Sequence, residues 1–142
     1  MKNVALFGAG RIGRIHASNL AALPGVRLKA VCDPMATAAS GLAAMHGATV
    51  SSVEAVFADK SIDVVAIASS TDTHSDLITR AAAAGKHIFC EKPVDMSVAR
   101  AQACADAVKA AGVACMISIS GLPTAPLSIL LRAALKVGSK RR

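Results

Sequence analysis

The feature that most constrains the fold is a glycine-rich turn that directly follows a short apolar run. Residues 4–7 are apolar, and Gly8-Ala-Gly-Arg-Ile-Gly13 then matches the pattern GxGxxG. A stretch with helical apolar periodicity, residues 12–23, follows the glycines and stops before a Pro-Gly pair. Together these predict a strand, a tight turn and a helix, which is how a dinucleotide-binding fold begins. The alternative is a glycine turn that merely connects the strand to the helix.

The same alternation continues to about residue 119. The fourth apolar run is almost continuously apolar and β-branched, which is typical of a parallel strand covered on both faces. Alternating strands and helices with right-handed crossovers predict an α/β fold, a doubly wound parallel sheet of the Rossmann type. We therefore expect one dinucleotide-binding domain over residues 1–119. The expected later strands are 26–32, 49–50, 62–68, 86–90 and 113–117, and the expected later helices are 37–46, 53–58, 73–84 and 98–111.

A single acid follows the glycine turn at the spacing that dinucleotide binding requires. Asp33 stands twenty residues after Gly13, at the predicted end of the second strand. Its carboxylate can accept both hydroxyls of an adenosine ribose and would repel a 2′-phosphate, and no Lys or Arg immediately follows it. We predict NAD rather than NADP, although Asp33 could also be a turn residue before proline. The predicted pyrophosphate contacts are Gly8, Gly10, Arg11, Ile12 and Gly13 at the start of the helix.

Two further polar groups follow the fourth and fifth predicted strands. In an open α/β sheet, ligands bind outside the carboxyl ends of the strands, so both groups are expected beside the nicotinamide. Hydroxyl and imidazole groups after the fourth strand could bind ribose or carboxamide, and they come from Ser69, Ser70, Thr71 and His74. Helix capping is an equally open interpretation for the hydroxyls, as is a surface position in the first helical turn for His74.

Glu91-Lys92-Pro93 follows the fifth strand. Pro93 could hold this loop so that Lys92 points toward the ligand, whereas the alternative is a solvated loop lysine. His16, His46 and His87 are interpreted as helix-face or strand-start residues without a role in the site.

The segments GAGRIGRIH, VCDP, ASSTDTH and AGKHIFCEKP, with their spacing, resemble the N-terminal half of the Gfo/Idh/MocA oxidoreductases. Within that family they are most similar to the inositol dehydrogenase members. The resemblance implies oxidation of a secondary alcohol of a cyclitol or sugar, with hydride passing to NAD. It also implies that Lys92 is catalytic and contacts the substrate and the nicotinamide side of the cleft. Glu91 would be among the cofactor contacts, and full-length relatives would be homo-oligomers. Proton removal would be carried by an Asp-x-x-x-His motif in a following α/β domain.

That second domain is not recognisable in this sequence. No histidine follows His87 and no acid follows Asp106, and residues 120–142 differ in composition from everything before them. We expect a single domain without the family's C-terminal domain, truncated and catalytically incomplete alone. The rest would be an atypical basic tail, with a helix at 127–137. A non-catalytic dinucleotide-binding or interaction module is the main alternative.

The net charge of +7 could suggest nucleic-acid binding. However, five of the 16 Lys and Arg residues come after Ser118, where there is no acid, and the preceding residues carry only about +2. No aromatic stacking surface accompanies the basic tail, so nucleic-acid binding is the weaker alternative.

The four cysteines show no CxxC spacing and no histidine cluster. We expect buried reduced thiols in a cytoplasmic protein, and no metal. No segment reaches the ~20 apolar residues that span a bilayer, and no signal-peptide pattern is present, so no membrane partner is expected.

Overall fold

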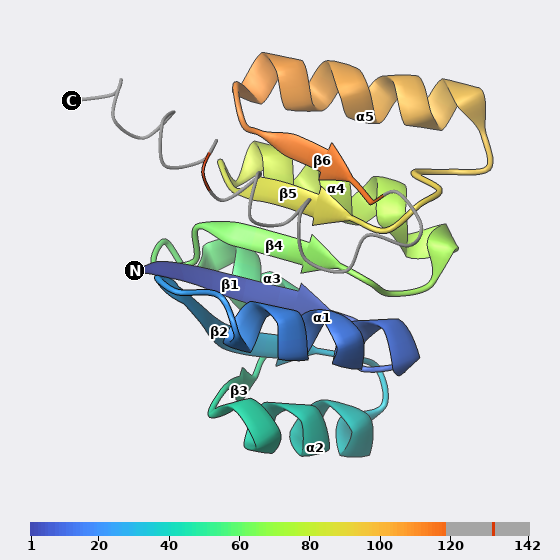
Figure 1. The fold of residues 1–142 in the computed structure, drawn as a ribbon. Coiled ribbons are helices and arrows are strands. Elements are labelled where there is room, and N and C mark those ends of the chain that lie inside the picture. The colour runs from blue at the N-terminus through green and yellow to red at the C-terminus, as the bar shows by residue number, and fades with distance from the viewer. Residues whose placement is uncertain (119–131, 133–142) are drawn as a thin grey trace.

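The computed structural model describes residues 1–118 and Arg132; the rest of the predicted tail, including most of the helix expected at 127–137, lies outside the described residues. One parallel sheet has the strand order β3-β2-β1-β4-β5-β6 (Figure 1). Its strands are β1 (Lys2–Phe7), β2 (Val26–Cys32), β3 (Thr49–Val50), β4 (Val64–Ile67), β5 (His87–Cys90) and β6 (Cys115–Ile117). The helices are α1 (Arg11–Ala21), α2 (Ala36–His46), α3 (Val53–Ala58), α4 (His74–Ala83) and α5 (Val98–Ala111), with a 3₁₀ turn η1 (Thr71–Thr73) before α4.

This order confirms the predicted Rossmann fold and the sequence of elements. From β1 the strands β2 and β3 are added on one side, and the chain then crosses back so that β4, β5 and β6 are added on the other side. The switch point of the sheet therefore lies between the neighbouring strands β1 and β4. Such a switch point is where doubly wound sheets bind their ligands. The fourth strand is shorter than the predicted 62–68, because only Val64–Ile67 pair with both β1 and β5. The first helix also ends at Ala21 rather than at residue 23.

Helices cover both faces of the sheet (Figure 1). On one face, α1 and α2 bury Leu20 and Leu42 against β-strand residues such as Leu6. On the other face, α3, α4 and α5 bury side chains such as Ile78 against strand residues such as Ile67. The central strands are therefore covered on both sides, as their continuous apolar sequence predicts. Alanine fills much of both layers, since nine alanines of the described residues are almost fully buried: Ala5, Ala9, Ala17, Ala30, Ala39, Ala43, Ala66, Ala81 and Ala82.

The carboxyl ends of the central strands meet in register. Phe7 is paired with Cys32 in β2 and with Ile67 in β4, and Ile67 is paired in turn with Cys90 in β5. The residue after each strand continues the pattern, since Gly8, Ala68 and Glu91 donate backbone N–H bonds of 2.7–2.9 Å to a neighbouring strand's last carbonyl. The sheet therefore delivers the glycine turn, the hydroxyl-rich segment and the Glu-Lys-Pro loop to one edge.

Candidate cofactor and lysine site

Two of the three motif glycines are required by the packing of the turn itself. Gly8 has φ of +105°, and a Cβ added to it would lie 2.4 Å from the carbonyl oxygen of Ala68. A Cβ added to Gly13 would lie 1.9 Å from the carbonyl oxygen of Gly8. Both distances are far inside van der Waals contact, and backbone atoms on both sides leave no room to move. Gly8 and Gly13 therefore let β1, α1 and the segment after β4 approach closely.

Gly10 differs, because a Cβ added there would meet no protein atom within 4 Å. Gly10 is the N-cap of α1, where no side chain caps the helix and no acid lies in the first turn. Arg11 and Ile12, the first two helical residues, are exposed. The open approach, the uncapped N–H groups and the positive helix end fit a pyrophosphate. The predicted phosphate contacts thus lie together at one helix terminus.

Asp33 is anchored to the glycine turn by its carboxylate. One carboxylate oxygen accepts a 2.8 Å bond from the backbone N–H of Ala9, and the other accepts a 2.8 Å bond from that of Met35. Each oxygen retains a free lone pair for a further donor. Asp33 is therefore held half-buried at the end of β2, beside the glycines and able to accept ribose hydroxyls.

A pocket of about 730 Å³ joins these groups. Gly8, Gly10, Asp33, Ser69 and Ser70 line it, so the structure brings together five of the predicted residues. Its volume falls in the usual range for ligand pockets. The other seven predicted residues do not line this pocket: Arg11, Ile12, Gly13, Thr71, His74, Glu91 and Lys92.

The far wall of the pocket was not predicted from the sequence. Arg80 of α4 lies there and donates to Glu54 at 3.3 Å and to Asp76 at 3.5 Å, while its guanidinium stacks 5.0 Å from the ring centre of Phe57. A backbone hydrogen bond to the Glu54 carboxylate lowers the pKa of this group most, and the bond from Arg80 lowers it further. The i, i+4 spacing of Asp76 and Arg80 was visible in the sequence, but the contact across to α3 was not.

The hydroxyls after β4 do not cap a helix with their side chains. Ser70 and Thr73 precede η1 and α4 without a side-chain cap bond. The hydroxyls of Ser69 and Thr73 instead share a 2.7 Å hydrogen bond, and the Thr73 hydroxyl also contacts the carbonyl oxygen of Ser70 at 2.6 Å. Thr71 lines a separate hollow together with Asp95. The capping interpretation is therefore wrong for these side chains.

His74 is not a surface residue. Its exposed fraction is 1%, although it occupies the first turn of α4. Nδ1 lies 2.7 Å from the carbonyl oxygen of Pro93, and Nε2 lies 2.9 Å from that of Ser69. Both ring nitrogens thus contact backbone atoms of the two loops that flank the expected nicotinamide position.

Glu91 and Lys92 lie in contrasting surroundings. The Glu91 carboxylate contacts Nε2 of His16, and the His16 ring packs edge-on against Phe89 with centres 5.0 Å apart. Lys92 is exposed and makes no hydrogen bond or ion pair within residues 1–118, and the Lys92–Pro93 peptide is cis. His16 lies on a buried face of α1, as expected for a helix-face residue, but the sequence did not indicate its contact with Glu91. Its place among the apolar positions of a predicted helix was the available signal of its burial.

The part of the chain that the structure describes holds no cluster of three or more His, Cys, Asp or Glu side chains able to bind a metal ion. None of its helices is long and apolar enough to cross a membrane.

Comparison with known proteins gives these features a family. Residues 2–119 match the model of the Gfo/Idh/MocA proteins, described as an oxidoreductase family with an NAD-binding Rossmann fold. The chain belongs to this family. The resemblance expected from the glycine turn and the Glu-Lys-Pro loop is therefore confirmed, with the cofactor class that the family carries.

An inositol 2-dehydrogenase of Rhizobium meliloti is 48% identical over 99 residues, which are 70% of this chain and 30% of that protein. The crystal structure of a myo-inositol dehydrogenase from Corynebacterium glutamicum is 40% identical with a TM-score of 0.77, covering 83% of this chain and 36% of the other. GenD2 from gentamicin A biosynthesis, solved in complex with NAD, is 31% identical with a TM-score of 0.80, covering 82% and 34%. The chain spans about a third of the length of these relatives.

Proposed function

We propose that this chain binds NAD(H) and supplies the cofactor-binding half of an oxidoreductase acting on a secondary alcohol of a cyclitol or sugar. The observation that carries the proposal is the single pocket that joins the glycine turn, Asp33 and the hydroxyls after β4. The inositol dehydrogenases among the relatives support the polyol class of substrate. Three of the four free cysteines are buried as expected, whereas Cys115 is exposed. Reduced thiols would fit the cytoplasmic location that we propose.

The charge of the pocket supports NAD over NADP. Four acids line it, Asp33, Glu54, Asp72 and Asp76, against one cation, Arg80. Because Arg80 is already paired with Glu54 and Asp76, it is poorly placed to neutralise a 2′-phosphate near Asp33. A further dianionic group would meet uncompensated negative charge, whereas a ribose 2′-hydroxyl can donate to the Asp33 carboxylate.

The reactive end of the site is assigned to Lys92. When bound, NAD supplies the hydride acceptor. Lys92 is exposed and has donors but no acceptor, so its ammonium can orient the substrate hydroxyl and stabilise developing negative charge on that oxygen. It cannot also take the hydroxyl proton while it is charged. Glu91 contacts His16, and His74 is buried with both ring nitrogens facing backbone carbonyls, so we assign the proton acceptor to the part of the relatives that this chain does not span.

Titration calorimetry tests the cofactor assignment. NAD should bind the 142-residue chain at least about tenfold more tightly than NADP, and Asp33→Ala should narrow that gap mainly by weakening NAD. Asp72→Ala is the matched control, since it removes an exposed acid of the same pocket without touching the glycine turn. Equal affinities for the two cofactors in the unmodified chain would contradict the assignment of Asp33 to the ribose.

Absorbance at 340 nm tests whether the proton acceptor lies outside this chain. With myo-inositol and NAD, the 142-residue chain should form NADH at least about 10²-fold more slowly than a fusion carrying the remaining two thirds of a relative, because general acid–base assistance alone contributes that much. Equal rates would mean that a residue of this chain takes the proton.

A further inference from the structure

One end of the Glu-Lys-Pro loop is held by a buried histidine from α1. His16 has an exposed fraction of 6%, and its Nε2 contacts the Glu91 carboxylate across 75 residues of sequence. Its Nδ1 is buried and has no hydrogen-bond partner among the described residues. An apolar side chain would fill this position without a buried unpaired nitrogen, so the contact with Glu91 is what an imidazole adds here.

The other end of the loop is held by a buried histidine from α4. His74 bridges the carbonyl oxygen of Pro93 and that of Ser69, at 2.7 and 2.9 Å. It thereby ties the Glu-Lys-Pro loop to the segment that lines the cofactor pocket. Helices α1 and α4 pack on opposite faces of the sheet (Figure 1), so the loop is contacted from both faces.

The held residues flank the one that is left open. Glu91 and Pro93 contact the two histidines, and Asp95 accepts bonds from the backbone N–H of Ser97 at 2.7 Å and from Arg100 at 3.0 Å. Lys92 stands between the first two and makes no polar contact within residues 1–118. Its backbone is thus fixed on both sides while its side chain stays available.

We propose that His16 and His74 are positioning residues that clamp the loop at 91 and 93, so that Lys92 is presented to the nicotinamide end of the site. This rests on the proposed function for the role of Lys92, but the clamp itself is a property of the loop. It gives His74 a role through Lys92 rather than direct contact with the cofactor, since both of its ring nitrogens are already engaged. It gives His16 a role that the glycine motif does not supply.

Hydrogen exchange of the Glu91 and Ser97 amides, which donate to the Ile67 carbonyl and the Asp95 carboxylate, tests the clamp without any ligand. His16→Leu should speed their exchange about tenfold, and His16→Gln, which keeps a donor, should restore most of the protection. His46→Leu is the matched control, because His46 also carries an unpaired buried nitrogen but lies on α2, away from the loop. His74→Gln is the second variant, and it should also speed this exchange because it disturbs the contacts of His74 with the Pro93 and Ser69 carbonyl oxygens. Unchanged exchange in His16→Leu, or equal acceleration in His46→Leu, would overturn the clamp.

Calorimetry with NAD and with ADP-ribose, which lacks the nicotinamide, tests whether the clamp positions Lys92 at the nicotinamide end of the site. His16→Leu and Lys92→Met should each weaken NAD about fivefold and leave ADP-ribose within about twofold, and the double variant should lose no more than either. Equal weakening of both ligands by His16→Leu would overturn a role at the nicotinamide end. If the unmodified chain bound neither ligand, the proposed function would fail, while the exchange experiment would still decide the clamp.

Discussion

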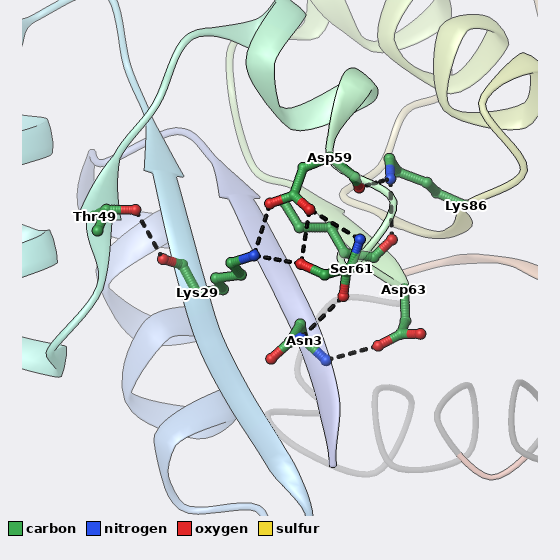
Figure 2. A network of polar contacts seen from close by, with 8 residues as sticks. Asn3, Lys29, Thr49, Asp59, Ser61, Asp63 and Lys86 are labelled. Carbon is green, nitrogen blue, oxygen red and sulfur yellow. Dashed lines mark hydrogen bonds and ion pairs between the residues drawn. The ribbon is translucent and has the colours of Figure 1, made fainter.

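The two edges of the sheet use their polar groups in opposite ways. At the amino edge, where the strands begin, side chains are paired with backbone groups: Asp63 accepts from the backbone N–H of Asn3 at 2.9 Å, and the Asn3 side-chain amide donates to the carbonyl oxygen of Ser61 at 2.9 Å (Figure 2). Lys86 is 3% exposed and donates to the carbonyl oxygens of Asp59 and Ile62 at 2.7 and 3.0 Å. Nearly every group drawn there has a partner within the chain.

At the carboxyl edge, Asp33, His74 and Arg80 have partners, but several other donors and charges are left open. The first turn of α1 has no side-chain cap, Gly10 faces empty space, and Lys92 has no polar partner within residues 1–118. Satisfied networks stabilise a fold, whereas unsatisfied groups at a rigid edge are free to bind. In this chain, the polar groups that stabilise the fold lie at the amino ends of the strands, and the groups that are free to bind lie at the carboxyl ends. Substitutions at the two edges should therefore change different measurements.

The largest effect is expected at Gly10. Gly10→Val should weaken NAD at least about 100-fold, because a side chain there fills the space through which the pyrophosphate reaches the helix N-terminus. The melting temperature should fall only slightly, by the poorer N-cap preference of valine, since a Cβ at Gly10 meets nothing within 4 Å. Calorimetry and thermal unfolding measure the two quantities.

Gly13→Val provides the contrast on the same turn. Its side chain would collide with the backbone of Gly8, so both stability and NAD affinity should fall. If Gly10→Val lowered the melting temperature as much as Gly13→Val, the turn would not separate the two roles.

The next effect is expected at Lys86 on the opposite edge. Lys86→Met keeps the aliphatic stem but leaves two carbonyl oxygens without their donor, which should cost about 2 kcal/mol of unfolding free energy and roughly 8 °C in melting temperature. The NAD affinity of the folded protein should stay the same, because the pocket lies at the other edge. Burial disfavours the charged form of Lys86 and lowers its pKa below the ordinary value. The substitution removes this unfavourable burial, so the loss of unfolding free energy is smaller than the two lost hydrogen bonds alone would give.

Lys60→Met is the matched control, since Lys60 belongs to the same edge and is exposed. It should change the unfolding free energy by less than about 0.5 kcal/mol. Urea unfolding of the three proteins gives the comparison, and a large change in NAD affinity with Lys86→Met would break the separation of the edges.

Much of this site could be predicted because its signals are local. Gly8, Gly13 and Asp33 act through a turn and a strand end whose spacing is set within one strand–helix–strand unit. The contact of His16 with Glu91 spans 75 residues and exists only because α1 packs over the sheet near β5. The pairing of Arg80 with Glu54 likewise requires α3 and α4 to share one face. Tertiary packing brings these partners together, and no local pattern specifies it.

The smallest effect is expected at Asp59, which joins the amino-edge network through its carboxylate (Figure 2). A 2.7 Å bond from Lys29, then the hydroxyl of Ser61 at 2.7 Å and its backbone N–H at 2.8 Å, hold the pKa of Asp59 well below its usual range. A carboxyl whose pKa is lower in the folded state binds protons more readily when unfolded. Its stabilising effect is therefore complete above the unfolded pKa of about 3.9 and is lost as the pH falls toward the folded value.

Asp59→Asn should consequently unfold more easily than the unmodified chain at pH 7, and the difference between the two should shrink as the pH falls below about 4. The neutral amide still accepts from Ser61 but loses the charge opposite Lys29. Urea unfolding at several pH values measures the difference, with Asp106→Asn as the control, because that exposed acid has only a 3.0 Å bond from Gln102. NAD affinity should be unchanged at every pH at which the protein is folded. A pH-independent difference would mean that Asp59 stabilises the edge by shape rather than charge, and a change in NAD affinity would mean that the two edges are coupled through the strands.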